Sequence, residues 1–238
     1  NGILYIVMEL CEGGDLGSVI KRCRRTKTHL PEETVWAYFA QMTAALEACH
    51  YRKVPSSATN VGARAVQAIL HRDLKPANCF LQKRSDGKDF IKLLDFGIAK
   101  ITDSTGEDGP ALTRAGFVCG TPEYMSPEQW ASGPVDARTD VFAAGVMLYE
   151  LLTGRPPFVG DSPVSIAYQH VGEDPSLPSS HEHSIPRALD TVIMHALVKD
   201  RDRRYQTADE FRDDLDIELV YRFMCDTVWV AVRWYRPG

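Results

Sequence analysis

Hydrophobic residues recur along the chain at spacings that predict several helices. Apolar positions three or four residues apart indicate a short helix near 16–23 and a longer one from about residue 31. The nearly continuous apolar run over 139–152 predicts a buried helix that ends at Gly154. Shorter helices are expected near 165–170 and 189–197, and a capping pattern at residue 207 opens another. The first helix rests on the spacing of Leu16, Val19, Ile20 and Cys23. The second carries one long apolar stripe that we interpret as core: Val35, Phe39, Met42, Leu46 and Cys49.

Three short runs along the chain predict strands. Residues 3–8 form an apolar run that reads as a buried strand. Residues 79–82 and 90–94 are expected to pair, because Asp86-Gly87 between them is a strong hairpin-turn signal. The chain is therefore predicted to be mainly α, with one small β-hairpin.

Composition narrows the class of protein. The chain has 238 residues, enough for one domain or two small ones, and its net charge of −5 argues against a nucleic-acid-binding surface. Its six cysteines form no C-x-x-C pair, which favours a reduced intracellular protein. There is no apolar run as long as a membrane span and no signal peptide. We expect a cytoplasmic protein, possibly part of a longer chain, with no nucleic-acid partner.

One stretch, residues 71–78, concentrates the candidate chemistry. Asp73 can accept a proton, Lys75 can offset negative charge, and the amide oxygen of Asn78 suits a hard cation such as Mg²⁺. Phosphoryl transfer needs a positioned hydroxyl, neutralised phosphate oxygens and held metal ions. The stretch supplies a group for each task. An ordinary surface turn is the alternative reading of these residues alone.

Two later motifs give the stretch a family resemblance. Asp95-Phe96-Gly97 follows across the predicted hairpin, and the run 120–128, Gly-Thr-Pro-Glu-Tyr-Met-Ser-Pro-Glu, comes after it. Together they make the chain, from about residue 4 to about residue 219, resemble the eukaryotic-type Ser/Thr protein kinase superfamily. The resemblance implies the C-terminal, large lobe of a kinase.

The resemblance also implies a division of the chain. Residues 1–15 would be the last small-lobe strand and the hinge, and 16–221 the large lobe. Residues 222–238 would be a tail with no assigned role. The segment 51–67 is unusual, because kinases place the catalytic loop almost directly after the preceding helix. It is either a true surface loop or untranslated sequence read through by a gene model.

The nucleotide site implied by the resemblance binds ATP with Mg²⁺. Asp73 would orient the acceptor hydroxyl and take its proton, Lys75 would steady the γ-phosphoryl, and Asn78 and Asp95 would hold the metal. Asp15 would either meet the ribose or cap the following helix. By position, Met8 would gate the pocket behind the adenine, the backbones of Glu9 and Cys11 would hydrogen-bond the adenine edge, and Phe80 would lie beneath the ring.

Further residues are implied to serve regulation, substrate choice and support. Thr121 would lie against Asp73 and Lys75, which points to Ser/Thr acceptors in protein substrates. Thr113 is the favoured phosphosite, with Arg72 as its partner, or else it is only a solvated loop residue. Support is expected from His71 packed near Phe96, from Asp140 beneath the His71-Arg72 turn, and from an ion pair between Glu128 and Arg204.

The family's first part is missing from the sequence. No G-x-G-x-x-G loop occurs, and no V-A-I-K-type lysine precedes the hinge. We therefore expect a protein Ser/Thr kinase by family, but little or no activity from this chain without a small lobe or a regulatory partner. The alternative is a non-catalytic, kinase-like interaction module.

Overall fold

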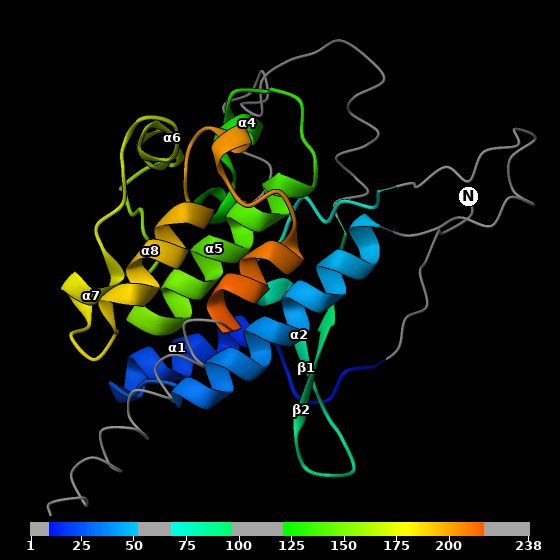
Figure 1. Ribbon diagram of the computed structural model, residues 1–238. Helices are drawn as coiled ribbons and strands as arrows, with labels where there is room; N and C mark the ends of the chain where they lie inside the picture. Colours follow the sequence, from blue (N-terminus) through cyan, green and yellow to red (C-terminus); the bar gives the residue numbers. More distant parts are fainter. Residues whose placement is uncertain (1–9, 52–67, 97–120, 217–238) are drawn as a thin grey trace, which may run out of the picture.

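A computed structural model describes residues 10–51, 68–96 and 121–216, and the predicted mainly helical architecture is confirmed (Figure 1). Helix α5 runs through the middle of the helical body, with α2 and α8 packed against it. The strands β1 and β2 form one two-stranded sheet. The helices are α1 (Leu16–Thr26), α2 (Glu32–His50), α4 (Pro127–Trp130), α5 (Ala137–Thr153), α6 (Pro163–Gly172), α7 (Pro178–His181) and α8 (Arg187–Ala196), and a further helical segment covers 208–216. Short 3₁₀ turns are η2 (Pro76–Asn78), η4 (Pro122–Tyr124) and η5 (Arg201–Arg203).

Helix α5 is buried along almost its whole length, as its apolar sequence predicts. Every residue from Thr139 to Leu151 is buried. The Asp136 side chain accepts a hydrogen bond from the backbone N–H of Arg138 at the start, and Gly154 ends the helix in the left-handed conformation, with φ of 73°. Gly145 lets α8 approach closely, because a Cβ there would lie 2.9 Å from the Cβ of Ala196.

The predicted apolar stripes of α1 and α2 form part of the same core. Leu16, Phe39 and Leu46 are each at most 1% exposed. The helical segment 208–216 closes this side of the core, where the rings of Phe39 and Phe211 pack edge to face with centroids 4.8 Å apart. The segment begins with only half of the predicted capping box. The hydroxyl of Thr207 accepts from the N–H of Glu210, but the Glu210 carboxylate accepts from Gln206 instead.

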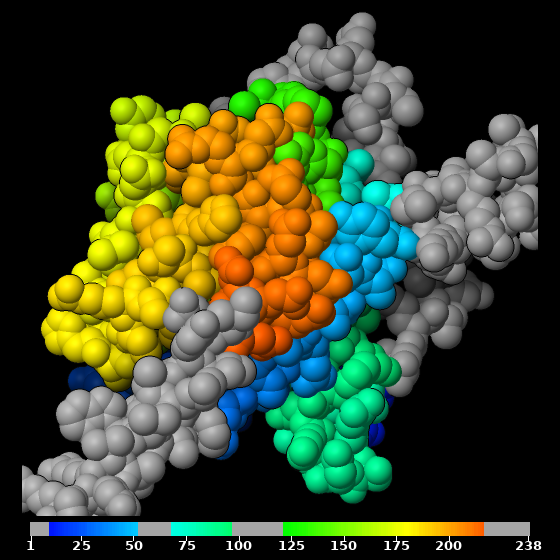
Figure 2. All heavy atoms as spheres, viewed as in Figure 1, coloured from blue at the N-terminus to red at the C-terminus, as the bar shows by residue number. Residues whose placement is uncertain are grey.

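The hairpin pairs as the sequence predicts. Strands β1 (Cys79–Lys83) and β2 (Asp89–Leu93) are antiparallel, in a register that runs from Cys79 opposite Leu93 to Lys83 opposite Asp89. Gly87 supplies the left-handed turn residue, with φ of 80°. The Tyr38 hydroxyl donates to the Asp89 carboxylate at 2.6 Å, which ties the hairpin to α2. Figure 2 shows the hairpin tip standing out from the helical body.

Several sequence predictions lie outside the described residues. They are the strand at 3–8, the insert apart from its first residue, the loop that begins at residue 97, and the tail. The chain on either side of the insert comes together, because the N–H of Ile69 donates to the carbonyl of Cys49 at 3.0 Å. Of the helices in the described part of the chain, none is long and apolar enough to cross a lipid bilayer.

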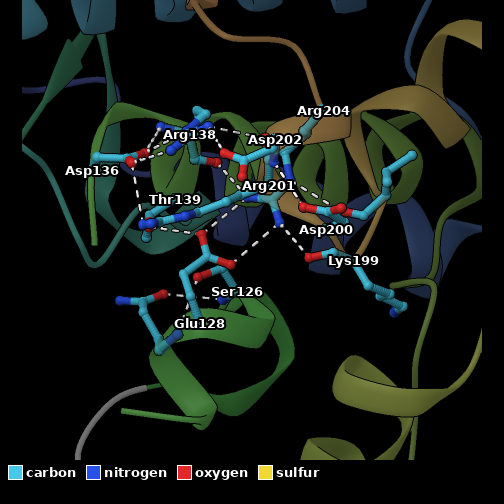
Figure 3. A network of polar contacts seen from close by, with 12 residues as sticks. Ser126, Glu128, Asp136, Arg138, Thr139, Lys199, Asp200, Arg201, Asp202 and Arg204 are labelled. Carbon is cyan, nitrogen blue, oxygen red and sulfur yellow. Dashed lines mark hydrogen bonds and ion pairs between the residues drawn. The ribbon is translucent and has the colours of Figure 1, made fainter. Parts of the chain in front are cut away.

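A polar network joins α4, the start of α5 and the η5 turn (Figure 3). The predicted pair is present in it: Arg204 Nη1 lies 3.0 Å from Glu128 Oε1, and the Arg204 side chain is fully buried. Thr139 also donates to Glu128, at 2.8 Å. Burial acts to raise the pKa of Glu128, but hydrogen bonds and charge from Arg204 outweigh it and hold that pKa below its usual value. The pair's contribution to stability is therefore present above the ordinary Glu pKa and is lost as pH falls through the lower one.

We expect Glu128→Gln to lower the free energy of unfolding by about 3–5 kcal/mol, because it leaves the buried Arg204 charge uncompensated. Urea denaturation measures the change. Replacing both partners, with Glu128→Leu and Arg204→Met, should cost less than the single change. As a control, Arg212→Gln removes a more exposed pair with Asp209 and should cost no more than about 1 kcal/mol. Equal losses at positions 128 and 212 would contradict the assignment.

A second prediction concerns His170, which is fully buried beside the rings of Phe142 and Phe158. Burial, and then the positive charge of Lys199, lower the pKa of His170 to about 3. Below a pH of about 6.5 the unfolded chain therefore binds a proton at His170 that the folded chain does not bind. The free energy of unfolding then falls by roughly 1.4 kcal/mol for each pH unit of acidification.

In His170→Phe, the unfolding free energy should fall less steeply between pH 6.5 and 4, by roughly 1.4 kcal/mol per pH unit. Denaturation at several pH values measures this slope. The exposed His183, changed to Gln, provides the control and should leave the slope as it is. A slope that His170→Phe does not alter would show that the ring is protonated in the folded protein.

Candidate active site

One carboxylate of α5 anchors the start of the loop 71–78 by hydrogen bonds to its backbone. Asp140, which is fully buried, accepts the backbone N–H of His71 on Oδ2 and that of Arg72 on Oδ1, both at 2.8 Å. Its Oδ2 also lies 2.8 Å from His50 Nε2, at the end of α2. Since a carboxylate only accepts, that ring nitrogen carries the proton. The predicted contact of Asp140 with the His71-Arg72 turn is thus present, and His50 is a further partner that the sequence did not reveal.

The turn places Asp73, Lys75 and Asn78 in one hydrogen-bonded group. Lys75 Nζ lies 2.8 Å from Asp73 Oδ2, and the Asn78 amide nitrogen donates to the Asp73 carbonyl at 2.8 Å and to Oδ2 at 3.2 Å. The side chains of Asp73 and Lys75 are about one-fifth exposed, at 21% and 20%. They are therefore reachable from outside, unlike the buried Asp140 beneath them.

The hairpin returns the chain to this group. The N–H of Leu94 donates to the carbonyl of Asn78 at 2.9 Å, which puts the next residue, Asp95, beside the loop. Asp95 is exposed and takes a left-handed backbone conformation, with φ of 57°. Phe96 stacks on His71, with ring centroids 4.6 Å apart, as expected from the sequence. Burial lowers the pKa of His71, which favours the neutral form of the ring that stacks on Phe96.

The donors available at this place fit magnesium delivered with a nucleotide. The Asn78 amide nitrogen is turned toward Asp73, which directs its oxygen to the opposite side, and the Asp95 carboxylate follows one residue after Leu94. Within the described residues there is no cluster of three or more His, Cys, Asp or Glu side chains able to hold a metal, and His181, of the triplet 181–183, is exposed. Mg²⁺ is usually bound by one or two protein oxygens together with substrate phosphates, so a two-donor set suffices.

The adenine side is only partly described. Met8 and Glu9 lie outside the described residues, and Cys11 is half-buried. Phe80 forms an isolated β-bridge with Asp15, which places it beside the end of the predicted hinge. Of the two roles considered for Asp15, the structure contains the capping contact: its Oδ1 accepts the N–H of Ser18 at 2.8 Å.

Thr121, expected to lie against Asp73, lines the same small cavity as Asp73 does. Tyr124, three residues on, donates its hydroxyl to Glu150, and Arg24 also donates to that carboxylate, at 2.5 Å. These bonds fix the segment after Thr121 to α5 and α1. Thr113, the predicted phosphosite, is outside the described residues.

Sequence reasoning missed Gln129, which also lines this cavity. Its side chain contacts the catalytic loop and the start of α4. A signal was present, because Ser126-Pro127-Glu128-Gln129 is a capping-box sequence with proline at the first helical position.

Comparison with known proteins found one matching family and several relatives. The family described as "Protein kinase domain" matches residues 1–214. The chain is 43% identical over 217 residues to serine/threonine-protein kinase pkn3 of Myxococcus xanthus, covering 90% of this chain and 36% of that protein. It is 47% identical over 216 residues to the PknB kinase of Mycolicibacterium smegmatis, covering 90% and 30%. The corresponding figures for PknB of Mycobacterium tuberculosis are 46% over 211 residues, 89% and 30%. The chain thus spans about a third of the length of these relatives.

We expect Asp140→Asn to loosen the catalytic loop, because the amide nitrogen must face an N–H donor where an oxygen accepted before. The free energy of unfolding should fall by about 1–3 kcal/mol, and the amides of His71 and Arg72 should exchange hydrogen faster. Asp190 provides a matched control. It is another buried carboxylate, and it accepts a hydrogen bond from the N–H of Ser179, in a part of the chain far from the loop 71–78. If Asp190→Asn speeds exchange at His71 as much as Asp140→Asn does, the link from α5 to the loop is not specific.

Proposed function

The chain belongs to the protein kinase domain family, and we propose that it carries the catalytic loop of an enzyme that transfers the γ-phosphate of ATP to Ser and Thr hydroxyls of proteins. The observation that supports this most is the Asp73–Lys75–Asn78 group, with Asp95 brought alongside by the hydrogen bond from Leu94 to Asn78. Each of these groups has a task in phosphoryl transfer.

In this proposal Asp73 is the base. Its carboxylate orients the acceptor hydroxyl and takes its proton, which is the step that makes the oxygen a better nucleophile. The bonds from Lys75 and Asn78 to Asp73 Oδ2 fix the rotation of the carboxylate. Lys75 also brings positive charge to the place where the γ-phosphoryl passes.

Asn78 and Asp95 would hold Mg²⁺ with the nucleotide. When bound, the metal neutralises charge on the phosphate oxygens. The two side chains come from different elements, the η2 turn and the end of the hairpin, and the Leu94–Asn78 bond sets their separation. Phe80, beside the hinge, would lie beneath the adenine, and Cys11 would border it.

The protein acceptor would lie against residues 121–125. Thr121 shares a cavity with Asp73, which agrees with a Ser or Thr hydroxyl approaching the base there. Arg72, whose backbone leads into Asp73, would meet a phosphate on Thr113. A non-catalytic kinase-like module could dispense with Asp73, Asn78 or Asp95, and the chain retains all three.

Asp73→Asn should reduce phosphate transfer by about 10²–10⁴-fold, because the amide cannot take the hydroxyl proton. The measurement is the transfer of labelled γ-phosphate to a Ser/Thr-containing protein, using the product of the complete gene, followed by phosphoamino-acid analysis. Unfolding free energy should change little, since the Asp73 side chain is partly exposed and an amide oxygen can still accept from Lys75 and Asn78.

Asp86→Asn at the hairpin turn serves as the control, because it makes the same substitution in an exposed loop far from the group. Its activity should match that of the unaltered protein. Transfer by Asp73→Asn at the unaltered rate would refute the assignment of the base. A protein that binds ATP but transfers no phosphate would favour the non-catalytic module.

A further inference from the structure

The backbone at Arg72 is strained, and a hydrogen bond restrains it on each side. Its φ is 61°, in the left-handed region that a residue with a side chain adopts only at a cost. The N–H of Arg72 donates to Asp140 Oδ1, and its carbonyl accepts from Gln129 Nε2, both at 2.8 Å. The carbonyl belongs to the peptide group that leads into Asp73. Side chains from two helices, α5 and α4, therefore fix the peptide planes before and after the strained residue.

The other end of the Gln129 amide is also engaged. Its Oε1 accepts the backbone N–H of Ser126 at 3.0 Å, and the Ser126 hydroxyl accepts the N–H of Gln129 at 3.4 Å. Ser126 is fully buried. The orientation of the amide is determined by these partners, because the reversed amide would set oxygen against the Arg72 carbonyl and nitrogen against the Ser126 N–H.

Gln129 thus spans the two segments that meet at the cavity lined by Asp73 and Thr121. One hydrogen bond restrains the Arg72–Asp73 peptide group, which precedes the proposed base, and the other restrains the end of the segment 121–126. A movement of this segment shifts the amide, and the amide shifts the Arg72–Asp73 peptide. The capping box alone does not require glutamine, since glutamate caps a helix start equally well. Only the amide can also donate to the Arg72 carbonyl.

We propose that Gln129 is a positioning residue, whose side-chain amide orients Asp73 through the Arg72 carbonyl and couples that orientation to the seating of residues 121–126. This inference rests on the proposed function for its consequence in catalysis. Its structural part, the restraint on the Arg72 peptide, stands on the hydrogen bonds alone.

Three variants separate positioning from capping. Gln129→Glu keeps the acceptor for the Ser126 N–H and removes the donor to Arg72. Gln129→Met keeps the length of the side chain and removes both bonds. Gln206→Glu is the matched control, because Gln206 Nε2 likewise donates to a backbone carbonyl, that of Arg204, at 2.6 Å and far from the loop. Each variant is made in the product of the complete gene.

Two readouts are taken on every variant. Hydrogen exchange at the His71 and Arg72 amides reports the restraint, and it should be about five- to tenfold faster in Gln129→Glu, the size expected for one lost hydrogen bond. Steady-state kinetics report the effect on Asp73: kcat should fall about tenfold in Gln129→Glu, with the KM for ATP within about twofold of its original value. The Ala131 amide, which follows α4 and donates to the carbonyl of Pro127, should keep its exchange rate in Gln129→Glu because the cap survives.

The outcomes divide cleanly. Gln129→Glu with unaltered exchange and unaltered kcat would overturn the inference and reduce Gln129 to a capping residue, and so would equal changes in Gln206→Glu. If Gln129→Met fails to fold, Gln129→Glu still decides. If the unaltered protein transfers no phosphate, the proposed function fails, and the exchange at His71 and Arg72 still tests the restraint separately.

Discussion

The carboxylate of Asp140 is the constraint on which the site depends. It lies at the start of the most buried helix of the described chain, where an unpartnered charge would be very costly. Its two oxygens are satisfied by the backbone of His71 and Arg72 and by the ring of His50. If the loop moved away from α5, this buried carboxylate would lose both of its backbone donors, at a large cost in free energy. The same contact therefore stabilises the core and fixes the position of the loop 71–78.

The candidate site divides into buried supports and accessible side chains, to which the proposed chemistry is assigned. Asp140, His71 and Ser126 are each fully buried. Asp73 and Lys75 are about one-fifth exposed, and Asp95 is exposed. Such a division suits a reaction that needs fixed geometry and also an entrance for a nucleotide and a protein. The left-handed backbones of Arg72 and Asp95 fit this picture, since strained residues persist only where the surroundings hold them.

The sequence was most informative where local pattern and burial agree. Helix α5 was predictable because it is apolar on all sides, and the hairpin because the Asp86-Gly87 turn signal separates two short apolar runs. The Glu128–Arg204 pair was reached only through the family resemblance, because its partners lie 76 residues apart. The catalytic roles of Asp73, Asn78 and Asp95 came from the same source and stay predictions.

Contacts between distant residues were beyond the reach of the sequence. His50 reads as one polar residue at the end of an amphipathic helix, and nothing nearby indicates that it pairs with a carboxylate 90 residues later. The start of α4 carried a recognisable capping signal, yet the second bond of Gln129 crosses 57 residues to Arg72. The incomplete capping box at Thr207 differs from the expected pattern for a local reason. The Glu210 carboxylate accepts from the backbone N–H of Gln206, one residue before the donor that the pattern predicts.

The central claim is that Asn78 and Asp95 converge on one metal-bound nucleotide beside Asp73. The most direct measurement replaces Mg²⁺ by Fe²⁺ in the presence of ATP, starts oxidative cleavage, and maps the cut sites by mass spectrometry, using the product of the complete gene. The account predicts ATP-dependent cuts at two places distant in sequence, next to Asn78 and next to Asp95. Cuts elsewhere, or at only one of these two places, would contradict it.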